Sequence, residues 1–171
     1  MDVFVEQIVK IKNSVARVLL MALIVVVAAA VAVFCFMYSM NPGYNLLLLG
    51  TVGALFGAYK LILMFFVEYE YIITNGTVDI DKIVAKSSRK RIVSFECKQI
   101  LRAGKYNKAA KPVTDATETM IFCNEDDPNA QYMLIDNNGK KWLIVFAPND
   151  KLKNAIKECV PRTMAKELFA D

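Results

Sequence analysis

The residues best suited to chemistry in this chain are basic and lie close together in the sequence. Between Lys86 and Lys111 the net charge is +8, and Glu96 is the one acidic residue. Such a density of ammonium and guanidinium groups suits anionic ligands, above all phosphate groups. The side chains expected to contact anionic phospholipid headgroups are those of Lys86, Arg89, Lys90 and Arg91. A solvated face that serves only solubility is the alternative interpretation.

Groups that would support catalysis or metal binding are sparse. The 171 residues include no histidine, so the usual general base near neutral pH and the commonest metal ligand are missing. The four cysteines form no CxxC pair. Ser87-Ser88 and Cys97, which stand beside basic residues, come nearest to a nucleophile, and no glycine-rich phosphate loop accompanies them. We therefore expect a non-catalytic protein without a cofactor or a metal.

The same basic stretch does not predict nucleic-acid binding. Only Phe95 and Tyr106 supply aromatic rings for stacking on bases, and the formal net charge of the whole chain is only +4. We therefore expect no nucleic-acid partner.

The elements that must position the basic residues begin with a long apolar segment. From Val18 through Tyr59, a window of 42 residues, the chain carries no charge. Residues 18–40 would make a helix of about 34 Å, and the hydrocarbon core of a bilayer is about 30 Å thick. Asn41-Pro42-Gly43-Tyr44 has the composition of a tight turn, and a second apolar run follows at residues 45–67. The pattern predicts a transmembrane hairpin with spans at about 18–40 and 45–67.

Charges that flank the two spans predict their orientation. Basic residues precede the first span and follow the second, whereas the connecting loop carries none. By the positive-inside rule both termini lie in the cytoplasm, and the protein is a multi-pass protein of the cell membrane. A cleaved signal peptide is the competing interpretation, which the continuation of the apolar run to Met40 disfavours. Before the first span, Phe4, Ile8, Ile11 and Val15 would share one face of an amphipathic helix in the inner interface.

Small residues recur at regular spacing on the second span. Gly50, Gly53 and Gly57 follow a pattern that allows two helices to approach closely without a polar group. Packing within the hairpin is the simplest interpretation. A homodimer face, or a face for an unknown membrane protein partner, is the alternative.

From Glu68 onward the hydrophobic period changes to two, which is typical of strands. Residues 68–74 and 77–81 flank Asn75-Gly76, the strongest short signal for a hairpin. Further strands are expected at 89–96, 99–103, 118–124, 131–136 and 141–146. A helix is expected after Pro148-Asn149, with Leu152, Ala155, Ile156, Cys159 and Val160 on its apolar face. A short tail helix would include Met164 and Leu168.

These segments together are similar to one family. The resemblance is carried by the two-span hairpin and by Glu68-Tyr69-Glu70-Tyr71-Ile72-Ile73-Thr74-Asn75-Gly76, Asp79-Ile80-Asp81-Lys82-Ile83, Arg89-Lys90-Arg91, Gly104-Lys105-Tyr106-Asn107, and Phe146 with Pro148-Asn149. The chain resembles a family of small bacterial two-span membrane proteins of unknown function, with a cytoplasmic pleckstrin-homology-like domain. The resemblance implies an α+β membrane protein and no catalytic residue. Residues 1–67 would hold the interfacial helix and the hairpin, and residues 68–171 an antiparallel barrel or sandwich with a C-terminal helix.

The function expected from these features is that of a non-catalytic, membrane-anchored adaptor or scaffold. It would present the β domain at the inner membrane surface for contact with a protein or with anionic lipid. The alternative is an accessory subunit of a larger membrane complex, held by packing of transmembrane helices. Specific phosphoinositide recognition is not expected, because the first hairpin loop is a bare Asn75-Gly76 followed by Asp79.

Overall fold

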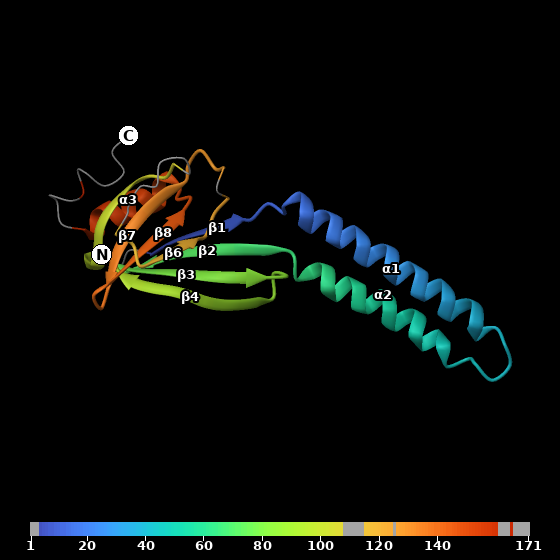
Figure 1. Ribbon diagram of the computed structural model, residues 1–171. Helices are drawn as coiled ribbons and strands as arrows, with labels where there is room; N and C mark the ends of the chain where they lie inside the picture. Colours follow the sequence, from blue (N-terminus) through green and yellow to red (C-terminus); the bar gives the residue numbers. More distant parts are fainter. Residues whose placement is uncertain (1–3, 108–114, 125, 161–164, 166–171) are drawn as a thin grey trace. The chain divides into compact units, whose positions relative to one another are not determined.

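The computed structural model describes residues 4–107, 115–124, 126–160 and 165 (Figure 1). These residues divide into two units. The helical unit consists of residues 12–67 together with the turn at 84–87, and the β unit of residues 1–11, 68–83 and 88–171. The expected tail helix with Met164 and Leu168 lies outside the described residues.

The helical unit is an antiparallel pair of helices joined by a tight turn. Helix α1 spans Val15–Ser39 and helix α2 spans Leu47–Leu63. The Ser14 hydroxyl caps α1 by accepting a hydrogen bond from the backbone N–H of Arg17 at 3.4 Å. In the turn, Tyr44 N donates to Asn41 O at 3.1 Å, and Gly43 has a φ of 89°. The predicted turn is therefore confirmed, with glycine at the position that requires positive φ.

Helical hydrogen bonding continues past both ends of α2. Leu47 N donates to Tyr44 O at 2.9 Å, and at the other end Phe66 N donates to Leu63 O at 3.2 Å. These bonds are of the i+3 type, so single 3₁₀ turns extend the α-helix and satisfy its terminal groups. By length and composition α1 is long and apolar enough to cross a membrane, and α2 is a shorter apolar helix.

The described residues of the β unit form two four-stranded sheets. In the first sheet the order is β1 (Phe4–Lys10), β2 (Val67–Thr74), β3 (Thr77–Val84) and β4 (Ser88–Glu96). In the second sheet the order is β5 (Ile100–Lys105), β7 (Gln131–Asn137), β8 (Lys140–Phe146) and β6 (Glu118–Ile121). A 3₁₀ turn, η1 (Cys97–Gln99), joins β4 to β5. The predicted Asn75-Gly76 turn is confirmed, with positive φ at both residues, and Asn138-Gly139 forms a second turn of the same kind between β7 and β8.

The amphipathic interfacial helix predicted before the first span is wrong. Residues 4–10 form β1, which pairs antiparallel with β2 and places Val5 opposite Ile73. Val5 and Val9 pack against the core of the β unit. Gln7 secures the strand, because its side-chain amide donates to Ala147 O at 2.9 Å and accepts from Asn149 N at 2.8 Å. These long-range contacts outweigh the helical spacing of Phe4 and Ile8.

The predicted seven antiparallel strands require two corrections. There are eight strands among the described residues, and β6 pairs parallel with β8 rather than antiparallel. Strand β7 pairs with β5 on one side and with β8 on the other, and β6 lies at the remaining edge of β8. In strand β5 the register shifts between Ile100 and Arg102, which interrupts the period of two.

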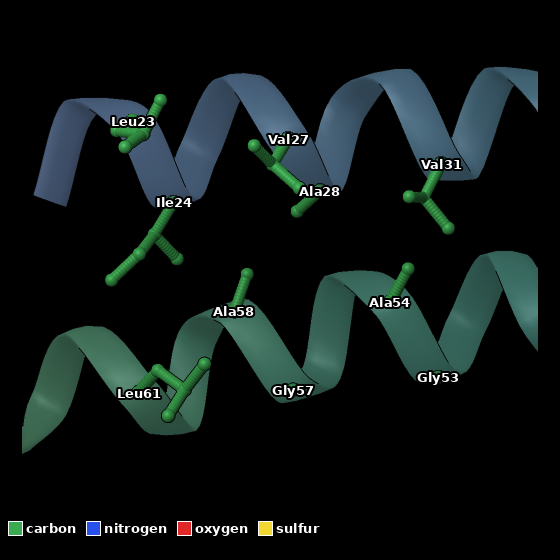
Figure 2. A pocket seen from close by; sticks show the side chains of 10 residues that line it. All are labelled: Leu23, Ile24, Val27, Ala28, Val31, Gly53, Ala54, Gly57, Ala58 and Leu61. Atoms are coloured by element: carbon green, nitrogen blue, oxygen red, sulfur yellow. The ribbon is translucent and has the colours of Figure 1, made fainter. Parts of the chain in front are cut away.

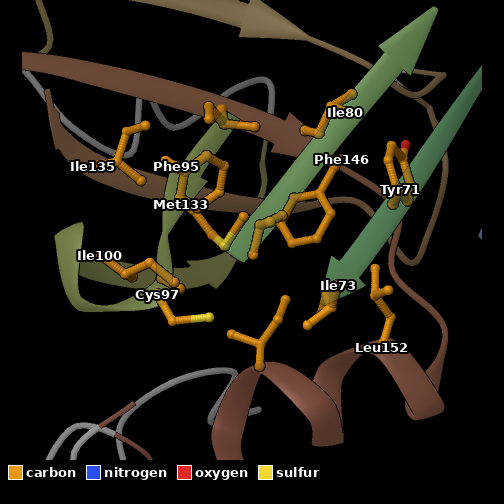
Figure 3. Packing of buried hydrophobic residues seen from close by; sticks show 14 of the residues in the cluster. Tyr71, Ile73, Ile80, Phe95, Cys97, Ile100, Met133, Ile135, Phe146 and Leu152 are labelled. Carbon is orange, nitrogen blue, oxygen red and sulfur yellow. The ribbon is translucent and has the colours of Figure 1, made fainter. Parts of the chain in front are cut away.

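The core of the β unit lies between the two sheets and beneath helix α3 (Asp150–Cys159). The Asn149 side chain caps α3 by accepting from Leu152 N at 2.8 Å. Leu152 and Ile156 are fully buried, and Leu152 points from the helix toward Ile73 and Tyr71 (Figure 3). The Tyr71 hydroxyl donates to Phe122 O at 2.7 Å, so the one polar group of this large buried side chain is satisfied.

Candidate functional site

Lys86 lies in the turn between β3 and β4, which belongs to the helical unit. Ser87 N donates to Val84 O at 3.1 Å and closes the turn. Ala85 N donates to Phe66 O at 3.0 Å, so the turn is bonded to the chain just beyond α2. Lys86 is exposed, and within the described part of the chain it makes no ion pair. Its ammonium group is therefore available to an external anion.

The backbone of this turn is unfavourable for its sequence. Ala85 and Lys86 have φ values of 55° and 56°, in the left-handed region that residues with a Cβ rarely adopt. That conformation costs roughly 1–2 kcal/mol for each such residue. The β3–β4 turn therefore stores strain that the two Asn-Gly turns avoid.

Arg89 is already bound to a buried carboxylate of the β unit. Its guanidinium nitrogens Nη2 and Nη1 lie 3.0 Å from Oε1 and 3.0 Å from Oε2 of Glu70. The Glu70 side chain is 0 % exposed, whereas that of Arg89 is 55 % exposed. Burial, followed by a hydrogen bond with Glu6, raises the pKa of Glu70 above its ordinary 4.5, although the charge of Arg89 opposes this.

Arg91 is held by two carboxylates of β3. Its Nε donates to Asp81 Oδ1 at 3.0 Å, and its Nη1 lies 3.1 Å from Asp79 Oδ2. Asp79 also accepts a hydrogen bond from the Ser94 hydroxyl at 2.6 Å. The bond to Asp81 raises the pKa of Arg91, so its charge is retained at any physiological pH.

The four residues expected to contact lipid thus fall into two groups. Arg89 and Arg91 have carboxylate partners in the β unit. Lys86 and Lys90 are exposed and make no ion pair within the described residues. The sequence reasoning missed the carboxylates, although a period-two signal was present: Asp79 and Asp81 are spaced two apart on one strand, as are Arg89 and Arg91 on the next.

An apolar groove runs between α1 and α2, with a volume of about 440 Å³ (Figure 2). Leu23, Val27 and Val31 line it from α1. From α2 it is lined by the small residues Gly53, Ala54, Gly57 and Ala58, which fill little of its volume. A Cβ atom added at Gly53 or Gly57 would meet nothing within 4 Å.

Gly50 differs from the other two glycines. A Cβ atom placed there would come within 3.1 Å of the Cys35 sulfur on α1. At the next residue of α2, the Thr51 hydroxyl donates to Ala32 O at 3.3 Å, which satisfies a polar group inside the hairpin. Gly50 therefore lies where a side chain would crowd α1, whereas Gly53 and Gly57 border open space.

The candidate nucleophiles lack the surroundings that would activate them. Cys97 is 2 % exposed, and burial raises its pKa to about 12, so it is a neutral thiol near pH 7. Ser87 lies in the strained turn beside Lys86, and its described bonds are those of the backbone. Among the described residues there is no cluster of three or more His, Cys, Asp or Glu side chains that could hold a metal.

Comparison with known proteins gives a match to one family model. No curated protein and no solved structure matches the chain. Residues 1–166 match the family model described as Bacterial PH-like domain (DUF6106). The match includes β1 and α3, so it covers the whole β unit as far as residue 166 as well as the helical hairpin. The chain therefore belongs to the bacterial PH-like domain family DUF6106.

Proposed function

We propose that this protein is a non-catalytic, membrane-anchored adaptor, in which α1 and α2 cross the cell membrane as a hairpin. The PH-like β unit then lies at the cytoplasmic surface, where it is available to a protein partner or to anionic lipid. PH-like domains are generally non-catalytic, which supports the absence of an enzymatic role.

The exposed apolar surface of α1 is the observation that carries the proposal. Only 6 % of its most apolar 18-residue window is buried, and the buried residues of the helix are Ala32 and Ser39. Twenty-five residues make a helix of about 37 Å, longer than the hydrocarbon core of about 30 Å. A surface of this size and polarity is unstable in water and stable in lipid.

The extended hydrogen bonding of α2 supports a second crossing. Bonded turns run from Tyr44 to Phe66, which is close to the expected span of 45–67. The polar side chains between the helices are satisfied locally: Thr51 donates to Ala32 O, and Ser39 donates to Phe36 O at 2.6 Å. Backbone and hydroxyl groups that bond within the hairpin meet the requirement of the membrane interior.

The distribution of charge supports cytoplasmic termini. The helical unit contains no acidic residue, and its basic residues flank the open end of the hairpin: Lys12, Arg17, Lys60 and Lys86. The turn at Asn41–Tyr44 has no charge. The positive-inside rule then favours the open end of the hairpin on the cytoplasmic side.

Labelling of single added cysteines tests this topology. Asn41→Cys, in the turn, should react with a membrane-impermeant maleimide in intact cells, whereas Lys151→Cys, on α3, should react only after permeabilisation. The parent protein measures the background from the four native cysteines. Release of the protein by alkaline carbonate, or the reverse labelling pattern, would overturn the proposal.

The groove favours one second candidate, an accessory subunit that binds a helix of another membrane protein. Gly53 and Gly57 expose the backbone of α2 to the groove, so a partner helix with a bulky side chain fits against them. Affinity purification from native membranes should then recover a membrane protein with the parent chain and lose it with Gly53→Leu/Gly57→Leu. Identical recovery with both chains would exclude this role for the groove.

A further inference from the structure

Among the described residues, three turns between neighbouring strands have positive φ at both central residues, and these turns differ in sequence. Asn75-Gly76 has φ values of 48° and 85°, and Asn138-Gly139 has 53° and 81°. These are the residues that such turns favour, since glycine lacks a Cβ and asparagine tolerates the left-handed region. The third turn has Ala85-Lys86 in the same conformation. The chain therefore accepts strain at one turn that the other two avoid.

Residues in strained backbone conformations cluster at functional sites, where the surrounding structure holds them in place. Asn-Gly at 85–86 would fit the backbone better, but it would remove the lysine. Lys86 is exposed, and the part of the chain that the structure describes offers it no carboxylate. Within the described residues, the charge of Lys86 is thus not used in an ion pair.

The position of the turn identifies what Lys86 would meet. Ala85 N is bonded to Phe66 O, three residues past the end of α2. If α2 crosses the bilayer, that point lies where the hydrocarbon core gives way to the headgroups. A lysine there extends its aliphatic stem along apolar surface and places its ammonium group among phosphates. No acidic residue in the helical unit competes for it.

We propose that Lys86 binds the phosphate of an anionic phospholipid, and that the strained Ala85-Lys86 turn is retained to hold it at that level. This role of Lys86 rests on the proposed membrane hairpin, and it assigns the protein's contact with anionic lipid to one side chain. Arg89 and Arg91 have a different role here, because their guanidinium groups are bound to Glu70, Asp79 and Asp81 within the β unit.

Full-length protein in lipid nanodiscs tests the proposal. The readouts are the thermal midpoint and the hydrogen exchange of the Ala85 amide, in phosphatidylcholine alone and in phosphatidylcholine mixed with phosphatidylglycerol. For the parent chain the mixed lipid should raise the midpoint and slow exchange about fivefold, as expected for one lysine at an anionic surface. Inorganic phosphate added to phosphatidylcholine discs should have no such effect, and an equal effect would overturn the assignment to a lipid.

Two variants and one control distinguish the effect of the Lys86 charge from the effect of the strained Ala85-Lys86 turn. Lys86→Glu should lose the response to phosphatidylglycerol. The double variant Ala85→Asn/Lys86→Gly should also lose it, yet unfold at a higher temperature than the parent chain in phosphatidylcholine, because the strain is relieved. Lys140→Glu, beside the Asn138-Gly139 turn, makes the same charge change and should keep the full response. An undiminished response in both Lys86 variants would overturn the proposal.

Alkaline carbonate extraction distinguishes a failure of the proposed role of Lys86 from a failure of the proposed membrane-anchored function. A parent chain that stays in the membrane, with a lipid response that does not depend on Lys86, would refute only the role of Lys86. A parent chain that is released would refute the membrane hairpin as well.

Discussion

Arg89 on β4 binds both carboxylate oxygens of Glu70 on β2, although β3 lies between these two strands in the sheet. Both contacts measure 3.0 Å, and the Glu70 side chain is completely buried. The guanidinium group therefore links two strands that share no backbone hydrogen bonds and supplies a positive charge to a buried carboxylate. The pair is a structural feature of the sheet, at a residue that the sequence alone suggested for ligand contact.

Arg89→Ala should destabilise the β unit because it leaves Glu70 buried without its cation. The expected loss in the free energy of unfolding is about 1–3 kcal/mol, the cost of an unsatisfied buried polar group. Lys90→Ala is the matched control, since Lys90 is exposed and unpaired within the described residues, and it should change stability by less than about 0.5 kcal/mol. Chemical unfolding of the purified variants measures the difference. Equal losses in the two variants would show that the ion pair contributes little.

Glu6→Gln should make the protein more stable near neutral pH. The raised pKa of Glu70 means that the folded state holds its proton more tightly than the unfolded state does. The contribution of Glu70 to the free energy of unfolding is therefore fully present below pH 4.5, the ordinary pKa. That contribution is lost as the pH rises through the pKa that Glu70 has in the folded state. The substitution removes the charge of Glu6, which is one cause of the raised pKa of Glu70. Glu6→Gln should therefore lose less stability than the parent protein as the pH rises.

Thermal unfolding of parent and Glu6→Gln protein between pH 4 and pH 8 checks that expectation. The difference between their midpoints should grow as the pH rises. Glu158→Gln, an exposed position on α3, provides the control and should follow the parent chain at each pH. A constant difference across the range would contradict the coupling between Glu6 and Glu70.

Gly50→Leu should weaken the helical hairpin, whereas Gly53→Leu should not. A Cβ at Gly50 already lies 3.1 Å from the Cys35 sulfur, so a larger side chain forces the helices apart. Gly53 faces open space in the groove. Unfolding in detergent, monitored by the mobility of a spin label at Asn41→Cys, should show a lower midpoint for Gly50→Leu alone. Similar midpoints for both variants would mean that the helices do not pack as described.

Cys97 should resist alkylation in the folded protein. It is buried, and its pKa of about 12 leaves almost no thiolate at pH 7. Mass spectrometry after treatment with iodoacetamide should find Cys97 unmodified in native protein and modified in denaturant. Rapid native modification would indicate that η1 opens readily, and it would restore Cys97 as a candidate nucleophile.

Local sequence patterns were sufficient to predict much of the fold. The Asn41–Tyr44 turn, the Asn75-Gly76 and Asn138-Gly139 hairpins and the apolar face of α3 each depend on residues close together in the chain. A turn requires positive φ at a particular residue, and a helix face requires a period of 3.6, so a short segment carries the whole signal.

The sequence by itself determined the two apolar helices, the tight turn between them, the alternating strands and the family to which they are similar. Tertiary structure alone decided that residues 4–10 form β1 and that β6 lies parallel to β8. It also decided that Arg89 and Arg91 are bound to carboxylates, whereas Lys86 is bound to none among the residues that the structure describes. Each of these outcomes depends on a contact between distant residues, such as Val5 with Ile73 or Glu70 with Arg89. Periodicity records how a segment can present its side chains, but the partner that completes each hydrogen bond or ion pair is chosen only when the sheets assemble.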